Sequence, residues 1–164
     1  MKRIMLISLL TICLLLIPGA VLGLNTAEVQ EKGGEITLLL VGDKGLQLGV
    51  EYGLTPEIGA YVQMQNNATQ VGAKYEFDSN LAILLGILND APFIGANLSM
   101  PLDDYIKLMG DFNLSLANNY LSALIEMGVA FKIVDNLDLR GGLVAEANNT
   151  GKTFSFQMGF GVNF

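Results

Sequence analysis

The sequence predicts an all-β protein, an up-and-down antiparallel β-barrel of about ten strands that follows a cleaved signal peptide. Three observations support this prediction. The first 23 residues have the order of a secretory signal, the remaining chain alternates apolar with polar or small residues, and short clusters of turn-forming residues separate the alternating stretches. Eight strands is the alternative count.

The N-terminal segment begins with two basic residues, Lys2 and Arg3, and continues with an unbroken apolar run over residues 4–17. Small residues follow as far as Gly23, after which we expect cleavage, so that residues 24–164 form one domain. An uncleaved membrane anchor is the alternative. It is disfavoured because Pro-Gly ends the apolar run and no stop-transfer charges follow.

The charge and residue inventory excludes several classes of function. Lys2 and Arg3 leave with the signal peptide, so the mature chain has 7 basic and 16 acidic residues and a net charge of −9, which argues against a nucleic-acid partner. The only cysteine, Cys13, lies in the signal peptide, and the chain has no histidine. We therefore expect no enzyme activity, cofactor or metal site, because the usual general base, nucleophile pairs and ligands are absent.

The strands are read from alternation between turn clusters. After a short polar lead-in over residues 24–34, we expect strands at 35–41, 46–54, 58–65, 69–77, 81–88, 93–100, 105–116, 120–133, 137–147 and 153–164. Many of these are close to the nine to eleven residues, roughly, that a tilted strand needs to cross a bilayer.

Each expected strand has one apolar face, most clearly in the last strand. There the apolar face carries Phe154, Phe156, Met158, Phe160, Val162 and Phe164. Charged residues within the strands all fall on the other face, which is also rich in glycine. Arg or Lys facing lipid near the bilayer midplane costs about 2–4 kcal/mol, so a membrane barrel sends such residues to its lumen. The candidate lumen charges are Glu51, Lys74, Glu76, Lys107, Asp111, Glu126, Lys132, Arg140 and Glu146.

Two further features favour a transmembrane barrel over a soluble β-sandwich. Only 15% of the residues are charged, which is few for a surface facing water. Six aromatic residues lie on the apolar face near the ends of even-numbered strands, which share one rim of an up-and-down barrel, and there they would form an aromatic girdle. They are Tyr52, Tyr75, Phe77, Phe131, Phe160 and Phe164.

The last eight residues, Gln157 to Phe164, resemble the C-terminal signal of bacterial outer-membrane β-barrel proteins, with Gln157, Gly159, Val162 and Phe164 in the characteristic places. Val162 departs mildly, because an aromatic residue is commoner there. The mature chain also resembles small barrels of the OmpA transmembrane or opacity type in its pattern. The resemblance implies an outer-membrane location among lipid, with the barrel-assembly machinery as a partner that recognises the last strand.

The function expected from these features is that of an integral envelope protein, either structural or a narrow, weakly selective pore for small solutes. With about ten strands the lumen is small and its charges can pair, so a mostly closed interior is favoured. The alternative is a soluble periplasmic barrel that binds an apolar ligand. In that barrel Phe156, Phe160 and Leu139 would line the cavity, while Lys74 and Arg140 would face water.

Overall fold

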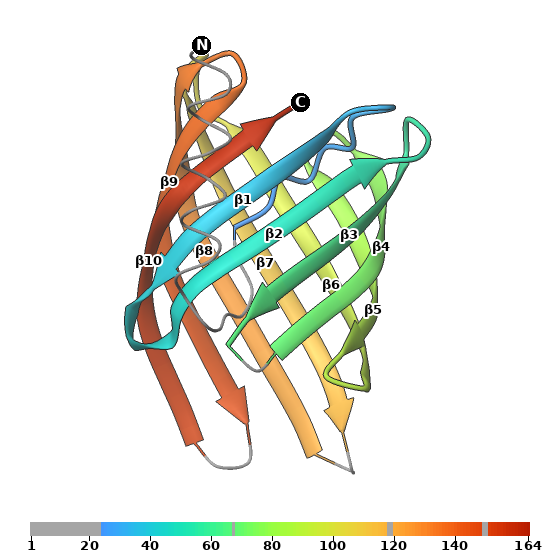
Figure 1. The fold of residues 1–164 in the computed structure, drawn as a ribbon, viewed down its shortest axis with the longest axis vertical. Helices are drawn as coiled ribbons and strands as arrows, with labels where there is room; N and C mark the ends of the chain where they lie inside the picture. The colour runs from blue at the N-terminus through green and yellow to red at the C-terminus, as the bar shows by residue number, and fades with distance from the viewer. Residues whose placement is uncertain (1–23, 67, 118–119, 149–150) are drawn as a thin grey trace.

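The computed structural model describes residues 24–66, 68–117, 120–148 and 151–164 (Figure 1). The expected signal peptide lies outside this part of the chain. The strands are β1 (Gly34–Val41), β2 (Gly45–Gly53), β3 (Ile58–Gln65), β4 (Ala68–Asp78), β5 (Leu81–Leu88), β6 (Ala91–Pro101), β7 (Ile106–Ala117), β8 (Tyr120–Val134), β9 (Leu137–Asn148) and β10 (Gly151–Asn163), with one 3-10 turn, η1 (Gly42–Lys44), between β1 and β2.

The ten strands form a closed antiparallel barrel. Each strand pairs with its neighbours along the chain, and β10 pairs with β1 to close the wall. The predicted ten strands are confirmed, and their ends agree with the predicted ones within two residues. The connections are short because turn-forming residues adopt the required backbone: Asn66, Asn89 and Asp90 all have positive φ. No helix in the described residues is long and apolar enough to cross a membrane.

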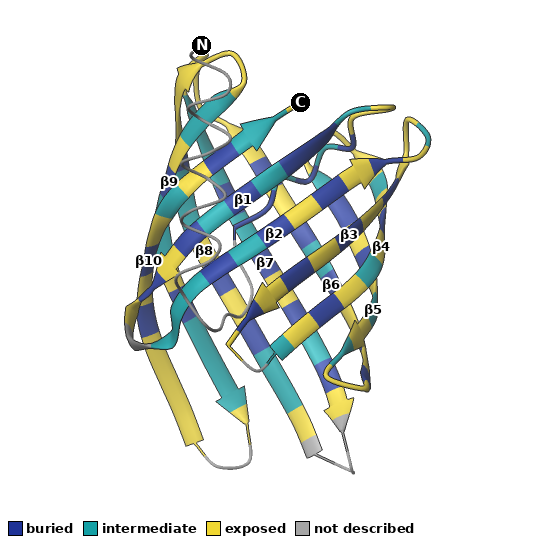
Figure 2. Cartoon of the chain, viewed as in Figure 1, coloured by how far each residue is buried: buried dark blue, intermediate teal, exposed yellow. Residues whose placement is uncertain are grey.

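Buried and exposed residues alternate along most strands (Figure 2). The exposed residues of this pattern are mainly apolar, so the apolar face of the wall points outward. In β10, Phe154 and Phe156 are 79% and 77% exposed, whereas Gln157 is 3% exposed. The predicted orientation of the faces is therefore confirmed. The alternative with an apolar interior is wrong, because Phe156, Phe160 and Leu139 all lie outside while Lys74 and Arg140 are buried.

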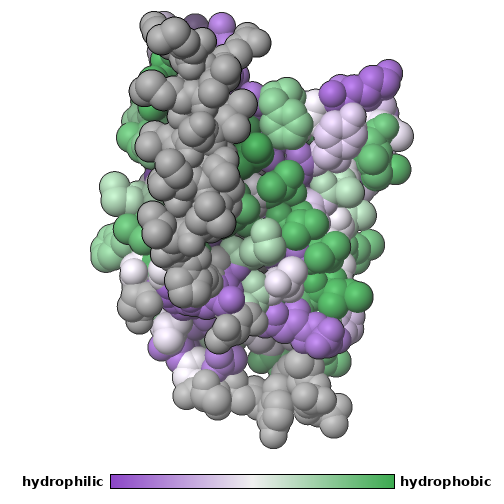
Figure 3. All heavy atoms as spheres, viewed as in Figure 1, coloured by the Kyte–Doolittle hydropathy of each residue, from purple (hydrophilic) through white to green (hydrophobic). Residues whose placement is uncertain are grey.

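The outer wall is apolar around the middle of the barrel. On the part of the face not covered by grey atoms in Figure 3, hydrophobic side chains fill the middle and hydrophilic ones gather toward the ends. The predicted aromatic residues lie outward at the rim where the chain ends, and each is more than two-fifths exposed: Tyr52, Tyr75, Phe77, Phe131, Phe160 and Phe164. Since aromatic side chains favour the membrane–water interface, this rim has the composition of a membrane boundary.

The lead-in, residues 24–33, enters the barrel instead of extending away from it. Leu24 and Ala27 have no exposed surface, and Val29 is 9% exposed. At its end the lead-in meets the rim, where Lys32 donates its backbone N–H to the carbonyl oxygen of Gly53. The sequence indicates only a short polar lead-in here, whereas in the structure this segment occupies the lumen. This is the main difference from the sequence-based expectation.

Candidate functional site in the barrel lumen

Two buried cations hold the start of the lead-in through its backbone. Arg140 on β9 donates from Nη1 to the carbonyl oxygen of Leu24 at 2.6 Å, and Lys74 on β4 donates from Nζ to the carbonyl oxygen of Thr26 at 2.7 Å. Both cations are about 1% exposed. Hydrogen bonds from charged donors are stronger than neutral ones, so these two contacts fix the backbone of the lead-in inside the barrel.

The next residues of the lead-in are held by β4, β6 and β7. The backbone N–H of Ala27 donates to Ser99 Oγ on β6 at 2.7 Å, and that of Val29 donates to Glu76 Oε2 on β4 at 2.5 Å. Glu28 lies between them and forms an ion pair with Lys107 on β7. Together with Arg140 and Lys74, these contacts connect the lead-in to four strands of the barrel.

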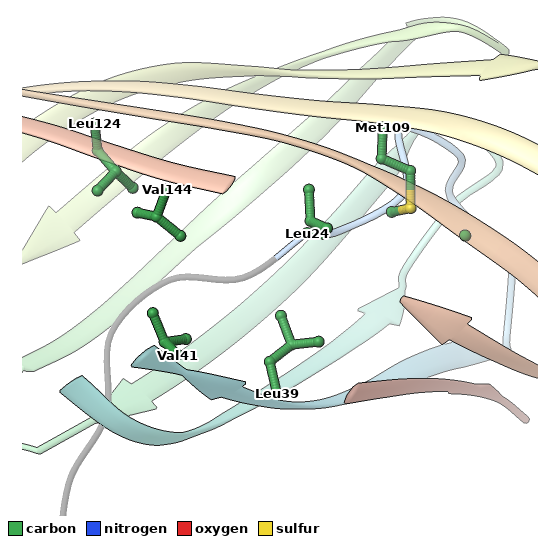
Figure 4. Close-up of a cluster of buried hydrophobic side chains, with 7 residues drawn as sticks. Leu24, Leu39, Val41, Met109, Leu124 and Val144 are labelled. Atoms are coloured by element: carbon green, nitrogen blue, oxygen red, sulfur yellow. The ribbon is translucent and has the colours of Figure 1, made fainter. Parts of the chain in front are cut away.

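The side chain of Leu24 completes an apolar layer inside the lumen. It packs with Leu39 and Val41 of β1, and the rest of the cluster is Met109, Leu124, Ala130 and Val144. The labelled side chains converge from opposite sides of the barrel toward Leu24 (Figure 4). Gly128 leaves room for this packing, because a Cβ atom there would lie 2.4 Å from Leu24 Cδ1. The apolar layer therefore extends across this section of the lumen.

A network of ion pairs lies beside the lead-in. Arg140 donates to both oxygens of Glu35 on β1, at 2.9 and 2.5 Å, and also to Asp138 on its own strand. Lys74 forms an ion pair with Glu51. Burying charges requires such pairing, because removal of a charge from water without a partner costs several kcal/mol. These pairs connect β9 with β1 and β4 with β2 across the inside of the barrel.

A second polar group, farther along the lumen, contains two carboxylates and three amides. Asp111 accepts hydrogen bonds from Asn97 Nδ2 at 2.7 Å and from Asn113 Nδ2 at 2.5 Å. Glu126 accepts one from Gln157 Nε2 at 2.9 Å. All five side chains are at most 3% exposed. No cation is within salt-bridge distance of either carboxylate among the residues that the structure describes.

Glutamine side chains line the lumen on β2, β3 and β4. Gln47, Gln63, Gln65 and Gln70 are all buried, and each has at least one side-chain nitrogen or oxygen without a hydrogen-bond partner in the structure. Buried amides normally have partners, either protein groups or ordered water. This side of the lumen therefore has the chemistry of a hydrated compartment.

Most of the charges predicted to lie in the lumen do so. Glu51, Lys74, Asp111, Glu126 and Arg140 are buried inside the barrel. The remaining four are partly or fully exposed toward the rims: Glu76, Lys107, Lys132 and Glu146.

Lys132 differs from the expectation. It lies at the rim beside a register irregularity in β8, where it pairs with the turn residue Asp135. This contact lowers the pKa of Asp135 below its ordinary value, because the adjacent ammonium group favours the ionised carboxyl.

Only part of the pairing was predicted. Both partners of the Lys74–Glu51 pair were candidate lumen charges, whereas Glu28 and Glu35, which pair with Lys107 and Arg140, were not. Glu35 lies on the lumen-facing side of β1, and the alternation of apolar and polar residues in the sequence identifies that side. Glu28 lies in the lead-in, where no periodic pattern indicates a position.

The residues that resemble an assembly signal lie on the strand that closes the barrel. Gln157 and Gly159 face the lumen, and the terminal Phe164 is 58% exposed at the rim. Phe164 exchanges two backbone hydrogen bonds of 3.0 Å with Gly34, the first residue of β1. Val162 lies on the outer face of β10 opposite Ile36. The chain end is therefore part of the β1–β10 closure.

The described residues contain no group of three or more His, Cys, Asp or Glu side chains that could hold a metal ion. The acidic turns have local roles instead. Asp78 accepts a hydrogen bond from the backbone N–H of Asn80, and Asp103 accepts two, from Tyr105 and Ile106. These are ordinary Asx-type turn contacts.

No known protein family matches the chain, and no curated protein matches it. Solved structures similar to the chain include three membrane proteins. A de novo designed transmembrane β-barrel is 12% identical over 84% of this chain and 99% of that chain, with a TM-score of 0.43. The N-terminal β-barrel domain of Pseudomonas aeruginosa OprF is 16% identical over 82% of this chain and 98% of that chain, with a TM-score of 0.42. The Yersinia pestis outer membrane protein Ail, in a phospholipid bilayer nanodisc, is 13% identical over 82% of this chain and 100% of that chain, with a TM-score of 0.48.

Because these TM-scores are all below 0.5, we assign the class of the protein from its own geometry. A closed up-and-down antiparallel barrel with an apolar exterior, a polar interior and an aromatic rim is the architecture of a transmembrane β-barrel of the outer-membrane type. The resemblance found in the sequence is confirmed at the level of the fold.

Proposed function

We propose that this protein is an integral β-barrel of the bacterial outer membrane with a closed lumen, acting as a structural component of the envelope without catalytic activity. The observation that carries this proposal is the position of the lead-in. Its backbone is bonded to Arg140 and Lys74, and the side chain of Leu24 fills an apolar layer across the lumen. A barrel of ten strands has little interior space to leave open around such a segment.

The outer-membrane location is supported by several features together. They are the apolar exterior, the signal-like first 23 residues and the C-terminal octet. The resemblance of that octet also makes the barrel-assembly machinery the expected partner during insertion. The absence of histidine from the chain supports a non-catalytic role.

A narrow pore is the second candidate, and the glutamine-lined side of the lumen favours it. The unpartnered amides of Gln47, Gln63, Gln65 and Gln70 suit a hydrated path along β2, β3 and β4. Lys74 on β4 is the buried cation on this side of the lumen. The two candidates predict different electrical behaviour for the same folded protein.

Single-channel recording in a planar bilayer tests the choice. The mature protein is refolded, its folding is verified by gel mobility, and a known porin is recorded in the same bilayer as a positive control. The closed barrel predicts no discrete current steps while the control conducts. Regular current steps from the folded protein would overturn the closed barrel and establish the pore.

A further inference from the structure

A row of oxygen-bearing side chains crosses three neighbouring strands inside the barrel. Asn97 on β6 is opposite Asp111 on β7 in register, and Asp111 is opposite Glu126 on β8. Side chains paired in this way on one face of an antiparallel sheet have Cβ atoms roughly 4.5–5.5 Å apart. The exposed fractions of these three side chains are 0%, 3% and 0%, so the two carboxylates are adjacent and shielded from bulk solvent.

The basic residues of the lumen do not neutralise these two carboxylates. Each lumen-facing cation that the structure describes already pairs with a different acid. The pairs are Lys44–Glu146, Lys74–Glu51, Lys107–Glu28, Arg140–Glu35 and Arg140–Asp138. Asp111 and Glu126 are therefore two adjacent carboxylates without a cationic partner from the described chain.

The surrounding amides supply further oxygen atoms. Asn97, Asn113 and Gln157 each donate their side-chain N–H to one of the carboxylates, so the three amides lie beside the pair. Asn113 Oδ1 lies over Gly95 on β6, where an added Cβ atom would be 2.0 Å from it. The carbonyl oxygens of the three amides, together with Glu126 Oε1, have no hydrogen-bond partner in the structure. Four buried oxygen atoms without partners beside two carboxylates form a group that requires a donor or a cation.

We propose that Asp111 and Glu126 bind a hard divalent cation of the calcium type, with the amide oxygens of Asn97 and Gln157 as additional ligands. Two carboxylates match a charge of +2. Calcium accepts six to eight oxygen ligands in flexible geometry and takes amide and carboxylate oxygens together, whereas magnesium demands near-ideal octahedral geometry and keeps several waters. Softer metals prefer sulfur or imidazole ligands, and the mature chain has neither cysteine nor histidine.

The bound cation would connect four strands of the wall, because its ligands come from β6, β7, β8 and β10. A ligand that binds only the folded state stabilises that state by an amount that grows with the ratio of the ligand concentration to its dissociation constant. The inference therefore predicts a barrel whose resistance to unfolding depends on calcium. It does not depend on whether the lumen conducts.

Isothermal titration calorimetry tests the site on the refolded mature protein in detergent after treatment with EDTA. We expect CaCl₂ to bind with one ion per barrel, and Asp111→Asn and Glu126→Gln each to weaken that binding by roughly tenfold or more. Glu57→Gln, which removes an exposed carboxylate from the β2–β3 turn, is the matched control and binds calcium like the unmodified protein. Gel mobility verifies that every variant is folded.

A second measurement needs no variant. The urea midpoint of the unmodified barrel should be higher in CaCl₂ than in EDTA, and KCl at equal ionic strength should not reproduce the increase. The assignment is overturned if the unmodified protein binds no calcium, if the two variants bind it as tightly as Glu57→Gln does, or if potassium binds and calcium does not.

Discussion

Arg140 and Glu35 are joined by two hydrogen bonds that pass over strand β10. The guanidinium comes from β9 and donates from Nη1 and Nη2 to the two carboxylate oxygens of Glu35 on β1. Gly161 of β10 lies directly beneath, since a Cβ atom there would be 2.1 Å from Arg140 Nη2. Because Arg140 also binds the carbonyl oxygen of Leu24, one side chain connects the barrel closure with the segment inside it.

Replacement of Arg140 by Met should destabilise the barrel strongly. The substitution leaves Glu35 and Asp138 without their cation, and breaking a buried ion pair from one side costs about 3–5 kcal/mol. The free energy of unfolding from urea titration in lipid vesicles measures the loss. The double variant Arg140→Met with Glu35→Gln should recover part of it, and a double variant no more stable than Arg140→Met alone would show that the pairing is not the cause.

Gly161→Ala should destabilise the barrel, whereas Gly110→Ala should not. A Cβ atom at position 161 collides with the guanidinium of Arg140, and overpacking of this kind costs about 1–3 kcal/mol. At position 110 the nearest heavy atoms to an added Cβ are 3.7 Å away. The urea midpoints of the two variants give the comparison, and equal midpoints would contradict the placement of Arg140.

Arginine substitutions distinguish the two faces of the wall. Met158→Arg and Leu139→Arg place a cation on the outward face, where it costs about 2–4 kcal/mol near the bilayer midplane. Gln157→Arg places it in the lumen beside Glu126, which lacks a cation. The yield of folded protein in membranes should fall for the first two and remain higher for the third. Equal yields would contradict the assignment of inside and outside.

Cysteine labelling locates the lead-in, because residues 24–164 contain no cysteine. In the folded barrel Ala27→Cys should react with a water-soluble maleimide only after unfolding, since Ala27 has no exposed surface. Glu57→Cys, on an exposed turn, should react at once and serves as the control. Rapid labelling of both positions would mean that the lead-in lies outside the lumen.

The sequence was sufficient to predict the wall of the barrel. Period-two alternation and turn clusters are local features, so β10 and its faces follow from Phe154 to Phe164 without knowledge of the rest of the fold. The same alternation places the candidate lumen residues Lys74, Asp111 and Arg140 on the lumen-facing side of their strands. Each of these inferences depends only on neighbouring residues along one strand.

The contents of the lumen could not be predicted in the same way. The lead-in has no periodic pattern, and its position depends on contacts such as Leu24 with Arg140 that join segments far apart in the sequence. Choice of ion-pair partner likewise depends on the shape of the closed barrel. Lys107 therefore binds Glu28 of the lead-in instead of an acid of the wall.

Heat-modifiable gel mobility, combined with membrane fractionation, tests the central claim of a transmembrane barrel most directly. The mature protein should remain with membranes after washing with urea, require detergent for extraction, and change its mobility in the gel between unheated and boiled samples. A protein that stays soluble without detergent and shows no mobility shift would contradict the transmembrane barrel, in which the exposed side chains of Phe154, Phe156 and Met158 face lipid.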